Sequence, residues 1–189
     1  MSGTGERLFG INTIYSVNDQ PPSPYMTRVW IGRLRLHIFH RGDLDADCHD
    51  HPWDFWTFPL TSYVEEVVHP VDPDFAYSEQ SSFRIRRELV RAFQLHFRPA
   101  THCHRVIGRW NGAWVLNWKS DNVDFTDPDT NDRRVITVVW RGKASRKWGF
   151  LKNRDGRWCW IHWKEYVFGG GKVAPCAPPT PSETKDLPQ

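Results

Sequence analysis

The stretch Cys48-His49-Asp50-His51-Pro52-Trp53-Asp54 decides how this sequence folds and what it can bind. Side chains alternate between the two faces of a β-strand, so residues two positions apart point the same way. His49 and His51 would then project side by side, about 7 Å apart along an extended strand. Two imidazoles at this spacing can converge on one metal ion, and the stretch therefore predicts two metal ligands.

A second short run, Pro99-Ala100-Thr101-His102-Cys103-His104, supplies further imidazoles. A histidine from a neighbouring strand would complete a set of three nitrogen ligands, and His104 is the candidate. Such a nitrogen-rich site suits Fe, Zn, Ni or Cu. His102 shares a face with His104 if the run is extended, so it competes for the same role. The alternative for His102 is a catalytic acid or base in the pocket.

The overall composition favours a soluble β protein and argues against two classes of partner. The 189 residues are enough for one domain with a hydrophobic core, and 11 Trp, 11 Phe and 5 Tyr favour strands. A net charge of +3 is too balanced to indicate a nucleic-acid-binding protein. No apolar run approaches the ~18 residues of a membrane span, and the N-terminus has no secretory signal. We therefore expect no nucleic-acid partner, no membrane association and a cytoplasmic location.

Breaker residues divide the chain into three parts. Residues 1–25 are predicted to form an irregular arm, and residues 169–189, rich in Gly and Pro, a disordered tail. Between them, residues 26–168 contain about ten short strand patterns and no convincing helix. In one of these, residues 33–38, Leu34, Leu36 and Ile38 share a face that we expect to be buried. The sequence thus predicts an all-β sandwich or barrel.

The four cysteines do not form a Cys-x-x-Cys pair. Cys48 and Cys103 each adjoin a candidate ligand histidine, where a disulfide or a thiolate ligand is conceivable. Reduced, buried thiols are the ordinary alternative, and the one we expect.

His49-x-His51 followed by Pro99-x-x-x-x-His104 resembles the two sequence motifs of the cupin superfamily. The second motif has Thr101 where that family has Gly, and the Glu that often follows the first motif is replaced by Phe55 and Trp56. The resemblance covers roughly residues 28–165. It implies a double-stranded β-helix, that is, a jelly-roll barrel.

The resemblance also implies a metal-dependent enzyme acting on a small molecule. A cupin site without that Glu is similar to the three-histidine Fe(II) site of thiol dioxygenases. Dioxygenase-like chemistry with Fe2+ is therefore expected first, with Ni2+ or Zn2+ as other ions and isomerase or lyase chemistry next. Two ligand sets remain open, His49, His51 and His104 alone or the same three with Asp54 as an oxygen ligand. The candidate substrate-binding residues are Arg33, Arg35, Tyr63 and Glu65.

Two other classes of function remain open. The barrel could bind a sugar, nucleotide or other metabolite without transforming it, which the aromatic content would also fit. The chain could instead be an interaction protein of a phage type that uses its Pro-rich tail. A homodimer is a further expectation, because open barrels have exposed strand edges that pair readily.

Overall fold

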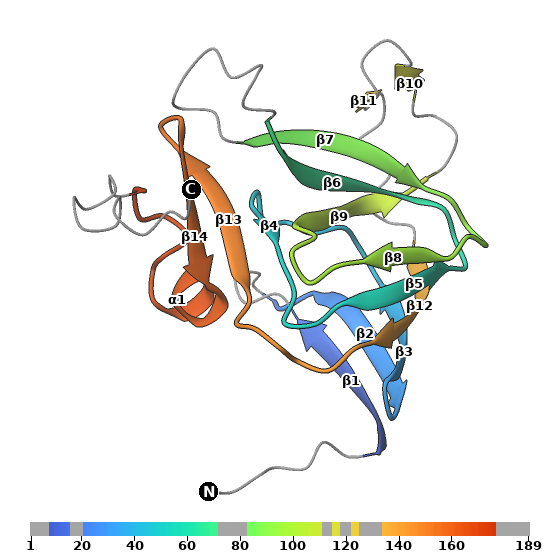
Figure 1. The fold of residues 1–189 in the computed structure, drawn as a ribbon. Coiled ribbons are helices and arrows are strands. Elements are labelled where there is room, and N and C mark those ends of the chain that lie inside the picture. The colour runs from blue at the N-terminus through green and yellow to red at the C-terminus, as the bar shows by residue number, and fades with distance from the viewer. Residues whose placement is uncertain are drawn as a thin grey trace, which may run out of the picture.

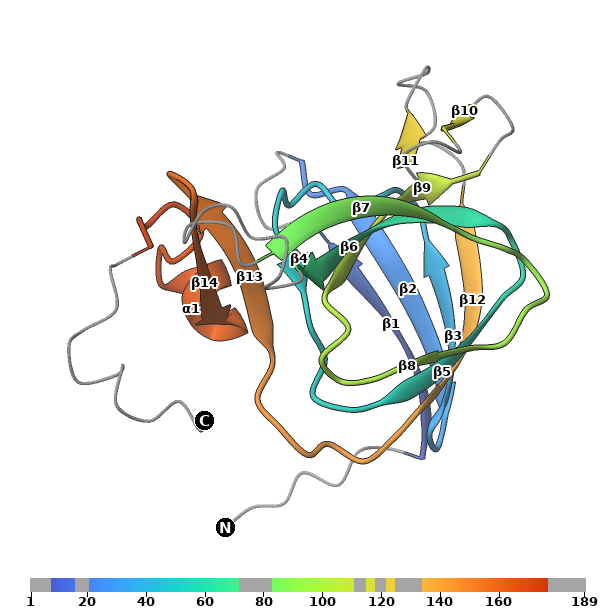
Figure 2. The same ribbon diagram turned by 45° about the horizontal axis from the view of Figure 1, so that its top comes forward.

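Two six-stranded antiparallel sheets face each other and enclose the interior of a barrel (Figures 1 and 2). The computed structural model describes residues 8–15, 21–71, 83–110, 115–117, 122–124 and 134–176. The first sheet contains, in spatial order, β1 (Phe9–Tyr15), β2 (Pro24–Ile31), β3 (Leu34–Phe39), β12 (Val135–Arg141), β5 (Phe55–Pro59) and β8 (His96–Arg98). The second contains β14 (Arg157–His162), β13 (Gly149–Arg154), β4 (Cys48–His49), β9 (His104–Arg109), β6 (Tyr63–Pro70) and β7 (Phe83–Val90). A small ribbon of β10 (Val115–Asn117) and β11 (Asn122–Asp124) and one helix, α1 (Trp163–Phe168), complete the described elements.

A hydrophobic core joins the two sheets. It is built from three side chains of each sheet, namely Met26, Phe39 and Val135 with Tyr63, Val90 and Val106. Each of these side chains is at most 9% exposed, so the core excludes water from this part of the interior. The predicted all-β jelly-roll fold is confirmed by these two packed antiparallel sheets.

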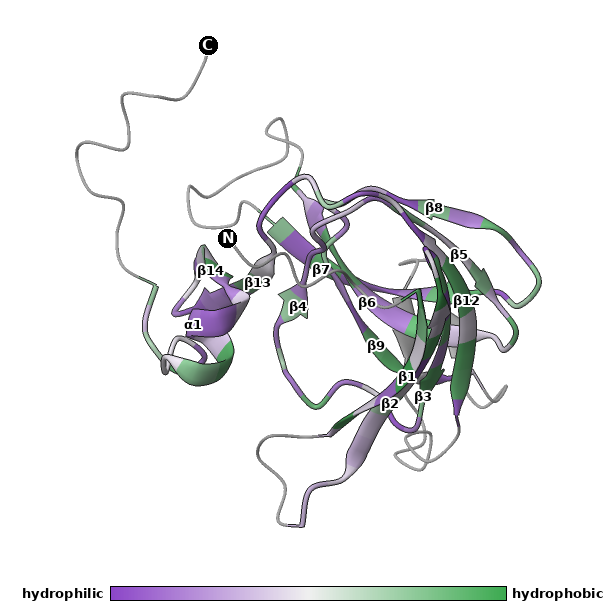
Figure 3. Ribbon diagram, turned by 90° about the horizontal axis from the view of Figure 1, so that it is seen from below, coloured by the Kyte–Doolittle hydropathy of each residue, from purple (hydrophilic) through white to green (hydrophobic). Residues whose placement is uncertain are grey.

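The face of β3 that points into the barrel is the opposite of the one expected to be buried. Met26, Phe39 and Val135 lie opposite one another in register and point into the core. Alternation therefore puts His37, two residues before Phe39, inside the barrel as well. Leu34 and its neighbours on the same face of β3 lie outside, and Leu34 is 42% exposed. Strand β12 is hydrophobic along most of its length (Figure 3), and the register places its Ile136, Val138 and Trp140 on the same outer face as Leu34.

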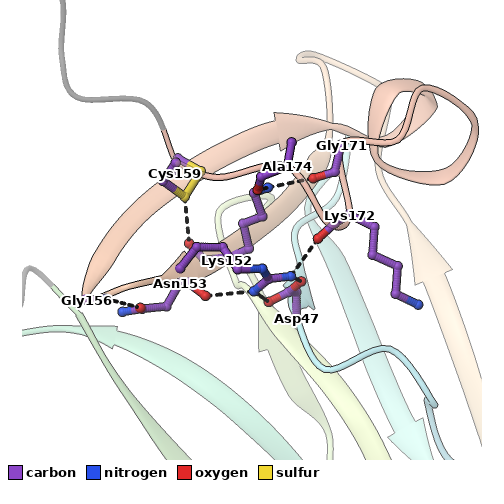
Figure 4. The surroundings of a disulfide bond; sticks show 10 residues. Asp47, Lys152, Asn153, Gly156, Cys159, Gly171, Lys172 and Ala174 are labelled. Atoms are coloured by element: carbon purple, nitrogen blue, oxygen red, sulfur yellow. Dashed lines mark hydrogen bonds and ion pairs between the residues drawn. A yellow bond between two sulfur atoms is a disulfide. The ribbon is translucent and has the colours of Figure 1, made fainter.

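The hairpin of β13 and β14 stands beside the barrel with helix α1 (Figures 1 and 3). The ring of Phe150 in β13 stacks on Tyr166 of the helix with 3.8 Å between centroids. The buried Lys152 amine donates to the backbone carbonyls of Gly171, at 2.6 Å, and Ala174 (Figure 4). These bonds hold the chain in place beyond Gly169 as far as Cys176, and residues 177–189 of the expected tail lie outside the described residues.

The last described residue, Cys176, forms a disulfide with Cys159 of β14 (Figure 4). The sequence did not suggest this pair. Cys48 and Cys103 are free and buried, as expected for reduced thiols. Burial raises the pKa of the Cys103 thiol to about 12 and raises that of Cys48 as well, so neither thiol is ionised near neutral pH. No described helix has the length and apolar character needed to cross a membrane.

We expect loss of the disulfide to destabilise this hairpin region. The bond closes a loop with a sequence separation of 17, for which restriction of the unfolded chain contributes about 3 kcal/mol. The Cys159→Ser/Cys176→Ser variant should therefore unfold at lower urea concentration than the natural protein. Adding a reductant should lower the stability of the natural protein only. Equal stability of the oxidised protein and the variant would contradict the prediction.

Candidate metal centre

The histidines of the two motifs meet where β4 and β9 run side by side. His49 in β4 lies directly opposite His104, the first residue of β9. His51 follows in a loop, and its backbone N–H donates to the carbonyl of Ala100 at 3.0 Å. The centroids of the three rings are 5.2, 5.5 and 5.2 Å apart. The structure thus brings the three predicted imidazoles together, although His51 arrives from a loop and not by alternation along a strand.

The spacing of the ring nitrogens fits a shared metal ion. Nε2 of His51 lies 3.0 Å from Nε2 of His104, and His49 offers a ring nitrogen within 4.8 Å of both. Two nitrogens bound at about 2.1 Å and at right angles around one ion would themselves be about 3.0 Å apart. Without an ion, the same two nitrogens can share a proton in an N–H···N hydrogen bond. The donor set of three neutral imidazoles suits a divalent transition metal.

Glu65 of β6 fixes the orientation of His104. The Glu65 side chain is completely buried, and its Oε2 lies 2.7 Å from Nδ1 of His104. Its other oxygen, Oε1, accepts a hydrogen bond from Arg98 of β8. Because an ionised carboxylate only accepts, Nδ1 of His104 must carry a proton, and Nε2 then keeps a free lone pair directed towards His51. This is the carboxylate–histidine arrangement that orients metal ligands in many proteins.

Burial keeps His51 and His104 neutral. It lowers the pKa of His104 to about 4, although the nearby charge of Glu65 acts in the opposite direction. Burial also lowers the pKa of His51, and the neighbouring His104 and His49 lower it further. For Glu65, burial raises the pKa, but His104, His102 and Arg98 outweigh that effect and lower the pKa overall. At neutral pH His51 and His104 are therefore neutral, with an ionised carboxylate behind His104, and only deprotonated imidazoles bind metals.

His102 lies next to this set without joining it. Its ring centroid is 4.7 Å from that of His104, and its Nε2 is 3.5 Å from Glu65 Oε1. That nitrogen is buried and has no hydrogen-bond partner in the described part of the chain. Glu65, His102 and His104 therefore form a second group with metal-binding spacing. The first group is the better ligand set, because both oxygens of Glu65 are already engaged by Arg98 and His104.

Aromatic rings surround the three histidines. Phe55 contacts His51 with 4.7 Å between centroids, and Phe150 lies 5.7 Å from His49. Trp148 contacts His49 from the loop before β13, at 6.1 Å. Phe55 and Trp56 occupy the positions where the first cupin motif often has Glu, and the Phe55 ring takes part in this wall. The wall limits access of water, which strengthens electrostatic interactions in the site.

The remaining predicted site residues lie in different environments. Asp54 is exposed, and its Oδ1 accepts a hydrogen bond from the backbone N–H of Ala100 at 2.7 Å, outside the group that could hold an ion. Tyr63 is buried in the core. Arg33 is exposed in the turn between β2 and β3. Arg35 points into the barrel and places its guanidinium 5.6 Å from the centroid of the Trp30 ring.

Two further residues outside the predicted site shape it. Arg98 provides the counter-ion of Glu65, and its only sequence signal was the alternation that puts His96 and Arg98 on one face of β8. Asp50, next to both ligand histidines, is buried and accepts hydrogen bonds from the backbone of Gly149, at 2.7 Å, and the indole of Trp160, at 3.1 Å. Asp50 thereby ties β4 to the β13–β14 hairpin and keeps His49 in position.

Several solved structures have a similar arrangement of strands. Hydroxypropylphosphonic acid epoxidase from S. wedmorenis aligns with a TM-score of 0.36 and 9% identity over 67% of this chain and 53% of that chain. The CENP-C cupin domain of Drosophila melanogaster aligns with a TM-score of 0.36 and 6% identity over 69% and 75%. A cupin domain from Bordetella pertussis aligns with a TM-score of 0.32 and 10% identity over 74% and 100%.

This chain spans about half the length of the epoxidase, and at these values the similarity concerns the arrangement of strands alone. No protein-family model and no curated protein matches the sequence. The fold therefore rests on the chain's own topology and on its two histidine motifs. Two facing six-stranded antiparallel sheets, with the histidines of both motifs brought together, give this chain a jelly-roll barrel.

Proposed function

We propose that this protein is a metal-dependent enzyme that acts on a small molecule, with the ion held by His49, His51 and His104. The observation that supports it most strongly is the 3.0 Å separation of two Nε2 atoms, one of them oriented by a buried carboxylate. Fe2+ is the favoured ion and dioxygenase-like chemistry the favoured reaction, with Ni2+ and Zn2+ as the other ions. Three imidazoles would leave coordination positions open for substrate and water.

When bound, such an ion would supply Lewis-acid and redox chemistry that protein side chains lack. The chain's own residues have separate tasks around it. Glu65 and Arg98 hold the Nδ1 proton of His104 in place, and the rings of Phe55, Phe150 and Trp148 limit access of water. His102 is placed to accept or donate a proton, because its buried Nε2 has no hydrogen-bond partner among the described residues.

The test begins with the metal content of the full chain. We expect protein stripped by a chelator and reconstituted without oxygen to bind about one equivalent of Fe2+, measured by elemental analysis after desalting. The His69→Ala variant is a matched control, because His69 pairs with Glu88 and lies outside the site. Oxygen uptake in the presence of small thiols and small organic acids would then identify the reaction. Failure of the natural protein to retain any of Fe2+, Ni2+ or Zn2+ would contradict the proposal.

Other outcomes would favour the other functions. A small molecule that binds and is recovered unchanged would favour a non-enzymatic metabolite-binding barrel. Loss of a protein partner on deletion of residues 177–189 would favour an interaction protein. The expected homodimer stays a prediction, which the exposed apolar side chains on the outer face of the first sheet support, among them Ile31, Leu34, Trp56, Phe97 and Trp140.

A further inference from the structure

The inner face of the first sheet carries positive charge without a carboxylate. The register of the strands aligns two rows of inward-pointing side chains beyond the core. The first row is Asn12, Arg28, His37, Thr137 and Pro59, and the second is Gly10, Trp30, Arg35, Val139, Thr57 and His96. Neither row contains Asp or Glu. Arg28 and Arg35 are therefore two cations on one wall of the barrel interior.

Arg28 has an unusual environment for an arginine. It is partly buried, yet it forms no hydrogen bond and no ion pair with the described part of the chain. Burial lowers its pKa, and the neighbouring charge of Arg35 lowers it further. A guanidinium remains charged in proteins, and a partly buried charge without a counter-ion lowers stability. Such a residue has a physical reason to be there if an anion from outside the chain pairs with it.

Two neighbours complete a cluster around Arg28. His37 lies opposite Arg28 in register, and Arg35 lies diagonally across the same pair of strands, where Cβ atoms are about 7–8 Å apart. The Arg35 guanidinium lies against the Trp30 ring and donates to the carbonyl of Gly32 at 2.6 Å, which keeps it at this end of the barrel. Trp30 also lines a solvent-open hollow of about 530 Å³, together with Leu8 and with Phe9, Gly10 and Ile11 of edge strand β1.

The cluster and the histidines lie along the same interior. Arg35, Val139 and Thr57 are adjacent in register, and Thr57 is two residues along β5 from Phe55, so both side chains of β5 point inwards. The Phe55 ring lies 4.7 Å from that of His51, centroid to centroid. A small molecule that extends from Arg35 across β12 and β5 would therefore reach the histidines.

We propose that Arg28, Arg35 and His37 form an oxyanion-binding subsite that holds the carboxylate or phosphate group of a small anionic substrate beside the metal centre. The subsite would set the substrate class of the proposed enzyme. Anion binding itself is independent of that function, and only its interpretation as substrate binding rests on it. Planar guanidinium groups bind carboxylate and phosphate oxygens through two parallel hydrogen bonds, which fixes the orientation of the ligand. The reacting end of the molecule would then face His51 and His104.

The test uses isothermal titration of the full chain with inorganic phosphate and, separately, with malonate. We expect at least one of the two anions to bind, and Arg28→Gln to weaken that binding at least tenfold. The matched control is Arg157→Gln, an exposed arginine at the start of β14, which should bind as the natural protein does. Preference for phosphate or for malonate would tell which kind of substrate group the subsite takes.

Stability and metal content separate this proposal from its alternatives. Because Arg28 has no partner in the described chain, Arg28→Gln should melt at the same or a higher temperature without ligand, whereas removal of a structural arginine would lower that temperature. Arg28→Gln should also keep its metal, and His51→Ala should keep its anion binding. Anion binding that depends on Arg28 in a protein that retains no metal would support the subsite and contradict only the proposed enzyme.

The opposite results would overturn the subsite. They are a metal-binding natural protein that binds neither anion, or an Arg28→Gln variant that binds as tightly as the natural protein. If Arg28→Gln fails to fold, Arg28→Lys keeps the charge and loses the paired hydrogen bonds. Its binding should then be weaker than that of the natural protein, and unchanged binding by Arg28→Lys would contradict the geometry proposed here.

Discussion

His51→Ala is expected to lose the bound metal, whereas His102→Ala is expected to keep it. The two variants separate the two groups with metal-binding spacing, because His51 belongs only to the first and His102 only to the second. Structural zinc sites bind with about 10–16 kcal/mol shared among four ligands, so loss of one ligand should weaken binding about 100-fold. His51 does not contact the Glu65–Arg98 pair, and the barrel should remain folded without its ring.

The measurement is metal affinity by competition with a coloured chelator, with circular dichroism to check that each variant is folded. His104→Ala removes a ligand common to both groups and should lose the metal in either case. A His51→Ala variant that keeps its metal, together with a His102→Ala variant that loses it, would place the ion between Glu65, His102 and His104. That result would contradict the three-histidine centre.

Glu65→Gln is expected to lower both stability and metal affinity. The substitution leaves Arg98, which is mostly buried, without its counter-ion, and breaking a buried ion pair from one side costs about 3–5 kcal/mol. It also removes the acceptor that holds the Nδ1 proton of His104. Loss of such a second contact weakens metal binding about 10- to 100-fold in other metal sites.

The adjacent Glu66 provides a matched control for this experiment. Glu66 is also buried and ion-paired, but on the other face of β6, where it meets Arg87 at 3.0 Å and Arg105 at 2.6 Å. Glu66→Gln should therefore lower stability in urea unfolding without changing metal affinity. Equal metal affinities for Glu65→Gln and Glu66→Gln would show that Glu65 does not orient His104.

Local patterns predicted the strands well, because the alternation of apolar and polar residues is visible within each strand's own sequence. The pattern over residues 33–38 correctly indicates β3. The same pattern did not reveal which face of β3 points inwards. An alternating strand satisfies either choice equally, and only pairing with β2 and β12 decides between them. Here the interior carries Arg35 and His37, and the leucines lie outside.

The carboxylate that supports the site could not be found from the local sequence pattern either. No acidic residue stands at Phe55 or Trp56, and the sequence therefore left open a site of three histidines, alone or with Asp54. Glu65 comes from β6, which pairs with β9 and brings the carboxylate to His104 across the sheet. Contacts between strands far apart in sequence leave no periodic trace along either strand.

The sequence by itself determined the chemical identity of the candidate ligands and the strand-rich fold, because imidazole spacing and side-chain alternation are local properties. Only the tertiary structure decided how those ligands are supported. It paired Glu65 with His104 and Arg98, joined Cys159 to Cys176, and left Arg28 inside the barrel without a partner in the described chain. These features depend on sheet register and on the closure of the barrel, which bring together residues that are distant along the chain.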